Sequence, residues 1–225
     1  DILATPDALA DGALIDKVDD VAGHKGTGRW TGEAALALGV SAPTLLAGFL
    51  ARTTSADGAA RAGANKAPRP HEVSSDDLRA ALQAATVMAY GEGFRLLQAA
   101  SEAHDWDLDF AAVARVWRGG CILRARMLDA IADAYAASPG LPCLAAAMPR
   151  VMAECDGGWR RTVAAGAKVG IALPVTSAAL GAYDALRMPA LWTSLVQAQR
   201  DRFGAHGYRR RDREGDFHSD WTGDV

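Results

Sequence analysis

The sequence has no excess of basic charge. It contains 24 Lys and Arg against 27 Asp and Glu in 225 residues, a formal net charge of −3 at neutral pH. A nucleic-acid-binding domain is expected to present a strongly basic face. The sequence also has no apolar run near the roughly 20 residues that a helix needs to cross a bilayer, and no visible signal peptide. We therefore expect binding to neither nucleic acid nor membrane.

Cysteine is scarce, and its spacing fits no known framework. Cys121, Cys143 and Cys155 are the only cysteines, odd in number and widely separated. They match neither a zinc-ligand spacing nor a set of disulfides, so we expect no metal site and a reducing, cytoplasmic setting. Cys121 has no identifiable base nearby, and we interpret it as a buried structural thiol.

Strand patterns are nearly missing as well. No alternating run of β-branched and aromatic residues is bounded by turns, whereas alanine and leucine, the best helix formers, recur throughout. The clearest helix is predicted over 75–101, with Ser74 and Asp77 resembling a capping box at its start. One face of this helix is predicted to carry Leu78, Ala81, Leu82, Ala85, Ala89, Gly93 and Leu96. The pattern indicates an all-α fold.

Other helices are predicted from the same period, four of them starting at a proline that suits a first helical turn. Gly170 is a plausible C-terminal cap. Residues 53–70 are predicted to form an exposed loop, and the charged tail after His206, with Phe217 and Trp221, is expected to dock onto something. The predicted helices are 12–22, 30–38, 43–54, 109–117, 120–135, 149–169, 174–187 and 189–203.

The sequence also lacks the features of a nucleotide-binding half. No GxGxxG follows a strand, so a dinucleotide-binding domain is not encoded here, and no pair of carboxylates stands at a convincing catalytic spacing. The first residue is Asp1 rather than Met. We expect the chain to be a fragment, a processed product or a trimmed piece of a longer protein.

Three basic segments are candidates for anion binding. Glycines around Lys25 and Thr27 would let backbone amides approach a phosphate at a helix start, or would merely soften a helix connection. Arg52, near a helix end, carries no functional claim by itself. Arg200 and Arg202, followed by His206 past a glycine, could form an anion clamp, or an ordinary basic helix end. The residues alone leave these alternatives open.

Several longer stretches resemble the long-chain form of the 6-phosphogluconate dehydrogenase family. They occur in the family's order and cover nearly the whole chain. The stretches are HKGTGRWTGEAALALGV (24–40), MAYGEGFRLLQ (88–98), VWRGGCILR (116–124), WRRTVAAGAKVGIALPV (159–175), SLVQAQRDRFGAHGY (194–208) and DWTG (220–223), where the family commonly reads NWTG.

The resemblance implies a function and a set of site residues. Family enzymes of the pentose phosphate pathway and gluconate utilization oxidise 6-phosphogluconate with NADP and decarboxylate it to ribulose 5-phosphate. It implies that Lys25, Thr27 and Arg52 bind the substrate phosphate, with Arg200 and His206 arriving from the partner subunit. It also implies a helical substrate-binding and dimerisation domain over 1–206 and a tail over 207–225 that reaches the other subunit of a homodimer.

The resemblance also implies what this chain lacks. The family's catalytic lysine and glutamate, its glycine fingerprint and most NADP contacts lie upstream of Asp1, so no catalytic residue is assigned and the chain alone is expected to be inactive. One alternative is a catalytically silent helical dimerisation module from a truncated gene. Another is a helical scaffold that binds an acidic partner through its Arg-rich tail.

Overall fold

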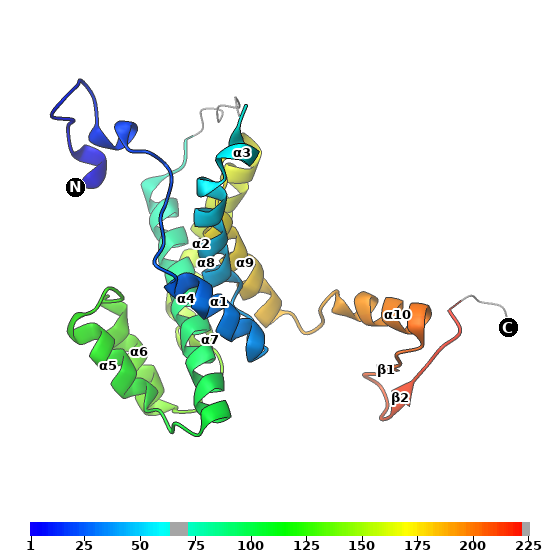
Figure 1. Cartoon of the computed structure of the whole chain (residues 1–225). Coiled ribbons are helices and arrows are strands. Elements are labelled where there is room, and N and C mark those ends of the chain that lie inside the picture. Colours follow the sequence, from blue (N-terminus) through cyan, green and yellow to red (C-terminus); the bar gives the residue numbers. More distant parts are fainter. Residues whose placement is uncertain (64–71, 222–225) are drawn as a thin grey trace. The chain divides into compact units, whose positions relative to one another are not determined.

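A computed structural model describes residues 1–63 and 72–221 and divides the chain into two compact units, Asp1–Tyr183 and Asp184–Val225 (Figure 1). This division places the last helix in the same unit as the tail. The boundary expected at residue 206 would separate the two, and it stays a prediction. In unit 1 the elements are two 3-10 turns, η1 (Ile2–Ala4) and η2 (Leu14–Lys17), and the helices α1 (Thr27–Ala37), α2 (Pro43–Ala56), α3 (Gly58–Arg61), α4 (Ser75–His104), α5 (Phe110–Gly120), α6 (Met127–Ala137), α7 (Leu144–Ala147), α8 (Pro149–Val169) and α9 (Pro174–Arg187), whose end from Asp184 on belongs to unit 2.

Unit 2 contains one helix and one small hairpin. After the end of α9 come α10 (Thr193–Gly204) and two-residue strands β1 (Tyr208–Arg209) and β2 (Asp216–Phe217), paired antiparallel with Tyr208 opposite Phe217. The fold is all-α, as the sequence predicted, because these two strands are the entire sheet content of the described residues.

The core of unit 1 forms around α4, which packs along α8 (Figure 1). Trp159 of α8 is fully buried, and its indole Nε1 donates to the carbonyl of Thr176 at 3.1 Å. Arg161, also on α8, donates two hydrogen bonds to Asp77 of α4 at 2.7 and 2.9 Å. The Trp159 segment therefore joins α8 to α9 through the indole and to α4 through an ion pair.

Several helix signals are confirmed at the level of single atoms. The Ser74 hydroxyl accepts the amide of Asp77 at 3.0 Å, so half of the expected capping box exists, while the Asp77 carboxylate binds Arg161 instead. Gly170 caps α8 with φ of 83°, a left-handed conformation that glycine adopts without strain. Pro43 and Pro149 each occupy the first turn of a helix.

Other sequence predictions are wrong. The helix predicted over 12–22 is only the single turn η2, and the one predicted from Gly120 begins at Met127 because residues 121–126 form a turn. The helix predicted from Pro189 begins at Thr193. The loop predicted over 53–70 is helical through Ala56 and again over α3, and residues 64–71 lie outside the described part of the chain.

Two burial predictions also fail. Leu78 and Leu82 are 50% and 70% exposed, whereas the small residues Ala81, Ala84 and Ala85 face the core. The apolar leucines of the first turns therefore do not lie on the packed face of α4.

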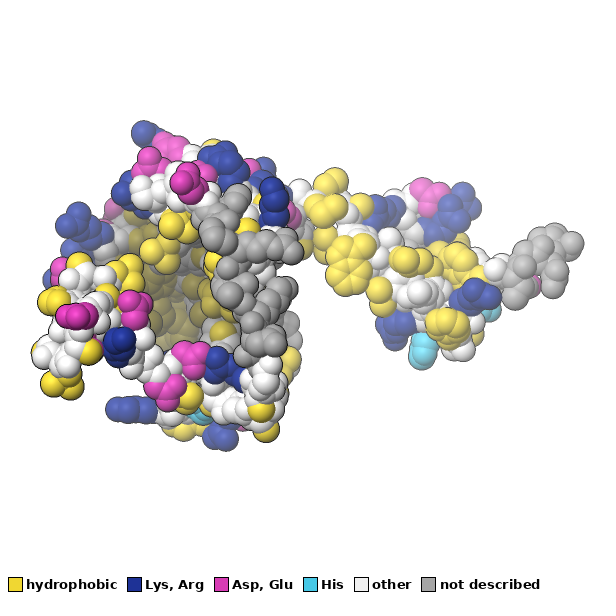
Figure 2. Space-filling view, turned by 90° about the horizontal axis from the view of Figure 1, so that it is seen from above, with side chains coloured by type: hydrophobic (Ala, Val, Ile, Leu, Met, Phe, Trp, Pro, Cys, Tyr) yellow, Lys and Arg dark blue, Asp and Glu magenta, His cyan; other side chains and the backbone are white. Residues whose placement is uncertain are grey.

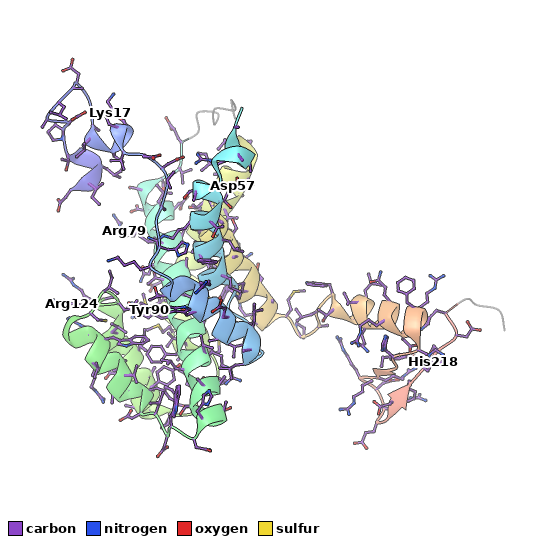
Figure 3. The ribbon with its side chains drawn as sticks, viewed as in Figure 1. Lys17, Asp57, Arg79, Tyr90, Arg124 and His218 are labelled. Carbon is purple, nitrogen blue, oxygen red and sulfur yellow. The ribbon has the colours of Figure 1, made fainter. Side chains whose placement is uncertain are left out.

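Cys121 is exposed rather than buried, because it follows the end of α5 in the turn toward α6. In Figure 3 Tyr90 lies between α4 and this turn, where its hydroxyl donates to the carbonyl of Leu123.

Candidate anion-binding site

The start of α1 has the features of an anion-binding helix terminus. Gly26 precedes the helix with φ of 96°, a conformation that a side chain would strain, and no side chain caps the first amides. Lys25 and Thr27 flank this glycine and are exposed. Free amides, the positive end of the helix dipole, an ammonium and a hydroxyl therefore lie within three consecutive residues, a combination that favours a phosphate.

Close packing fixes α1 against α2. A Cβ on Gly32 would lie 2.7 Å from Cδ2 of Leu46, and one on Gly28 would lie 3.4 Å from Cδ2 of Phe49. The first distance is shorter than any real carbon contact, so the absence of a side chain at Gly32 makes room for the Leu46 side chain of α2. The position of Lys25 and Thr27 is therefore set by α2, the helix that carries Arg52.

The segment before α1 lies along α2 on both sides of Arg52. The ring of His24 meets that of Phe49 edge-on at a centroid distance of 5.4 Å. Further back, the amide of Ala22 donates to Oγ of Ser55 at 2.9 Å, and this hydroxyl donates to the carbonyl of Arg52 at 2.8 Å. Phe49, Arg52 and Ser55 follow one another at three-residue intervals and so share one side of the helix. The structure thus brings Arg52 next to the Lys25 segment.

The other end of α2 is held by a buried carboxylate that sequence reasoning missed. Glu92 of α4 accepts the amides of Thr44 and Leu45, the first free donors of α2, at 3.0 Å each. Burial raises the pKa of Glu92, and the bonds from Thr44 and Leu45 oppose this rise. The motif that contains Glu92 was recognised, but a glutamate amid alanines and glycines gives no sign of a cap 48 residues away.

In unit 2, Arg200 and His206 are linked through a glutamine. Nη1 of Arg200 donates to Oε1 of Gln197 at 3.1 Å, and Nε2 of Gln197 donates to the carbonyl of Gly207 at 2.7 Å. His206 immediately precedes this glycine, and both basic side chains are exposed. Arg200 and the backbone next to His206 are therefore held on one small network.

The centre of unit 2 is Asp201, which the sequence analysis did not single out. Its carboxylate is fully buried. Oδ1 accepts the amide of Gly207 at 2.8 Å and lies 2.9 Å from Nδ1 of His218. Oδ2 accepts the amide of Ser219 at 3.1 Å and the indole of Trp221 at 2.7 Å. Burial alone would raise the pKa of Asp201, but the hydrogen bonds from His218, Trp221, Ser219 and Gly207 outweigh it and lower this pKa.

The tail therefore docks on its own helix. Trp221 packs on Tyr208 at a centroid distance of 5.7 Å, and Tyr208 packs on Phe217 at 6.3 Å. Figure 3 places His218 beside α10, where its ring meets Asp201. One feature of the sequence could have indicated this docking. The spacing of Gln197 and Asp201 puts two polar groups on one side of α10.

The described residues include no group of three or more His, Cys, Asp or Glu side chains arranged to hold a metal ion. No helix in the described part of the chain is both long and apolar enough to span a membrane. The joining of Lys25, Thr27 and Arg52 in unit 1 with Arg200 and His206 in unit 2 stays a prediction.

Fold and site together define a helical domain that presents basic groups at an exposed helix start. Residues 1–221 match the family model described as "6-phosphogluconate dehydrogenase, C-terminal domain". The chain therefore belongs to the 6-phosphogluconate dehydrogenase family and corresponds to the family's C-terminal domain.

Individual relatives agree with this assignment. The chain is 40% identical to the chloroplastic 6-phosphogluconate dehydrogenase, decarboxylating 1, of Arabidopsis thaliana, over 99% of this chain and 49% of the relative. It is 37% identical to the NADP(+)-dependent, decarboxylating enzyme of Bacillus subtilis, over 98% and 50%. A solved structure of the Plasmodium falciparum enzyme, described in its apo form and with NADP+ or 6-phosphogluconate, matches with a TM-score of 0.89 and 38% identity, over 98% and 50%. The chain thus spans about half the length of these relatives.

Proposed function

We propose that this chain is the helical part of an NADP-dependent enzyme that oxidises and decarboxylates 6-phosphogluconate to ribulose 5-phosphate, and that it binds the phosphate of the substrate. Lys25, Thr27 and Arg52 form one part of this site. Arg200 and His206 form the other part, contributed by a second copy of the chain. The membership in the family and the likeness to relatives named for this activity support the proposal.

One observation carries the phosphate site. The uncapped start of α1 lies against α2, and the segment that holds Lys25 contacts α2 at Phe49 and Ser55, on either side of Arg52. Two permanent cations and several free amides on neighbouring elements suit a dianionic phosphate, since charge-assisted hydrogen bonds are about twice as strong as neutral ones.

Binding of the phosphate is tested by thermal unfolding of the chain with 6-phosphogluconate or with gluconate, which lacks the phosphate. A ligand that binds only the folded state raises the unfolding temperature. We expect a rise with 6-phosphogluconate, a much smaller one with gluconate, and loss of the difference in Lys25→Gln and Arg52→Gln. Arg29→Gln is the matched control, an exposed arginine of the same helix start that faces Glu33 at 3.5 Å. Equal shifts with both ligands, or no shift at all, would count against the phosphate site.

We propose no residue of this chain for hydride transfer. NADP supplies the hydride acceptor in the family, and the described residues hold only the hairpin β1–β2, not a parallel sheet with a glycine-rich turn on which such a cofactor lies. We expect purified chain to show no NADP reduction with 6-phosphogluconate.

The three cysteines are free thiols, which supports a reducing, cytoplasmic location.

A homodimer is supported by the two faces of α10. Gln197 and Asp201 bind the tail on one face. Leu195 and Phe203 lie on the opposite face, and Trp192, the residue just before the helix, continues their period; Trp192, Leu195 and Phe203 are 71%, 64% and 81% exposed. Figure 2 shows many hydrophobic side chains on the visible surface of unit 2. Exposed aromatic and aliphatic groups in one stripe are typical of an interface, and sedimentation of the chain should show a dimer that Phe203→Glu dissociates.

The alternative of an acidic partner for the Arg-rich tail is less well supported. Arg209 lies 3.3 Å from Asp216, and both Arg210 and Arg213 approach Asp212, at 2.7 and 3.8 Å. These arginines thus already face acids of the tail itself, which reduces their attraction for an external anion.

A further inference from the structure

The turn that carries His206 is held to α10 through both backbone groups of Gly207. The amide of Gly207 donates to Oδ1 of Asp201 at 2.8 Å, and its carbonyl accepts Nε2 of Gln197 at 2.7 Å. The helix ends at Gly204 and is capped by Ala205, which is left-handed with φ of 50° and whose amide donates to the carbonyl of Asp201 at 2.8 Å. The backbone on the C-terminal side of His206 therefore has no freedom independent of Gln197 and Asp201.

The imidazole of His206 also has a close neighbour. A Cβ built on Gly204 would lie 2.9 Å from Nε2 and 3.0 Å from Cδ2 of the ring. Such distances do not occur between real carbon and ring atoms without a shift. The space left by Gly204 is thus occupied by the His206 ring, although the backbone of Gly204 is helical and would accept alanine.

Asp201 does not serve the tail alone. A buried carboxylate needs several donors to stay ionised, and Asp201 takes them from two separate places, the turn at Gly207 and the tail at His218, Ser219 and Trp221. An ionised carboxylate only accepts, so Nδ1 of His218 donates to it. Any displacement of the tail therefore also disturbs the acceptor that holds Gly207.

From these contacts we infer that Asp201, Gln197 and Gly204 are positioning residues of the proposed phosphate site. Asp201 and Gln197 fix the backbone after His206, Gln197 also holds the guanidinium of Arg200, and Gly204 leaves room for the imidazole. The inference rests on the proposed function only in assigning a ligand to Arg200 and His206. The placement of the two side chains can be tested without any ligand.

The first experiment measures amide hydrogen exchange by NMR on the full chain. In Asp201→Asn we expect exchange at Gly207 and Ser219 to accelerate about tenfold or more, because both amides lose a charged acceptor. The matched control is Asp212→Asn, which removes an exposed tail carboxylate bonded to Arg210 at 2.7 Å and should leave both amides unchanged. Unchanged exchange at Gly207 in Asp201→Asn would overturn the inference, whatever the ligand data show.

The second experiment separates position from stability with Gly204→Ala. Alanine should leave the unfolding temperature unchanged or raise it, because alanine favours a helix more than glycine does. The ring resonances of His206 should shift, while Gly207 keeps its slow exchange. Unmoved His206 resonances would contradict the role of Gly204.

A third arm adds 6-phosphogluconate. If the wild-type His206 resonances respond to it, both Asp201→Asn and Gly204→Ala should weaken binding at least several-fold, while Asp212→Asn should not. Wild-type affinity in these two variants would refute the positioning role. If the wild-type protein does not respond, the proposed phosphate site fails, and the exchange and ring-shift results still decide whether Asp201 and Gly204 place His206.

Discussion

Glu92 of α4 accepts the backbone amide of Thr44 at the start of α2, with nitrogen and oxygen 3.0 Å apart, although 48 residues separate them in sequence. Its second oxygen accepts the amide of Leu45. The carboxylate thus replaces a local capping side chain, since Ala42, the residue before the helix, offers none. It ties the helix that carries Arg52 to the central helix of unit 1.

We expect Glu92→Gln to lower the free energy of unfolding by about 1–3 kcal/mol, because an amide has one acceptor oxygen and leaves one buried N–H facing its own NH₂ group. Glu154→Gln is the control, since Glu154 is exposed and pairs with Arg150 one turn away; exposed pairs of this kind contribute about 0.3–0.5 kcal/mol. Urea unfolding measures both. Equal losses in the two variants would show that Glu92 does not cap α2.

Gly32→Ala should damage both stability and phosphate binding. The new Cβ would lie 2.7 Å from Cδ2 of Leu46, so the Leu46 side chain must give way and the contact between α1 and α2 is disturbed, at a cost of about 1–3 kcal/mol. Lys25 is then held less firmly near Arg52. Gly48→Ala is the control within α2, because its Cβ would meet Val175 at an ordinary 3.7 Å. Unfolding curves and the thermal shift with 6-phosphogluconate report the two effects, and a Gly32→Ala protein as stable as Gly48→Ala would contradict the packing.

The sequence predicted helices best where local chemistry decides them. Ser74, Pro149 and Gly170 act within one turn of a helix end, so their roles were visible in the sequence. The helix over 12–22 failed because its apolar residues, such as Leu14 and Val18, are exposed and have no packed face to bury. Helical period without a partner surface does not stabilise a helix of that length.

The same distinction holds for the candidate site: residues close to a local signal were predicted, and residues with distant partners were not. Lys25 and Thr27 were recognisable because the glycines and the helix start lie within a few residues of them. Glu92 and Asp201 were not, because their hydrogen-bond partners are 6 to 48 residues away and depend on how the chain folds back. An acid between two arginines, as at Asp201, looks like a solvated helix end until the tail is placed on it.

Thr162→Val should leave the protein as stable as the wild type or stabilise it by up to about 1 kcal/mol. The Thr162 hydroxyl is buried in α8 and has no hydrogen-bond partner among the described residues, so removing it relieves a desolvation cost while nearly the same volume is kept. Trp159→Phe, three residues earlier in α8, is the contrasting variant, because it deletes the bond to Thr176 and should destabilise. A loss above about 1 kcal/mol in Thr162→Val would mean that the hydroxyl has a partner.

Acid should release the tail through Asp201. Its pKa is lowered in the fold because, although burial acts to raise it, the bonds from His218, Trp221, Ser219 and Gly207 prevail. The folded state therefore binds fewer protons than the unfolded state, and stability from these bonds is present above the ordinary carboxyl pKa of 3.8. It falls as the pH drops through that value and is lost at the folded pKa.

The indole N–H resonance of Trp221 reports this release directly, because that group donates to Asp201 at 2.7 Å. We expect the resonance to stay constant from pH 7 to about pH 5 and to move toward that of a free indole only at lower pH. In Asp201→Asn it should be displaced already at neutral pH and change little with acid, whereas Asp212→Asn should behave as the wild type. A wild-type transition that begins near neutral pH would show that a group other than the Asp201 carboxylate holds the tail.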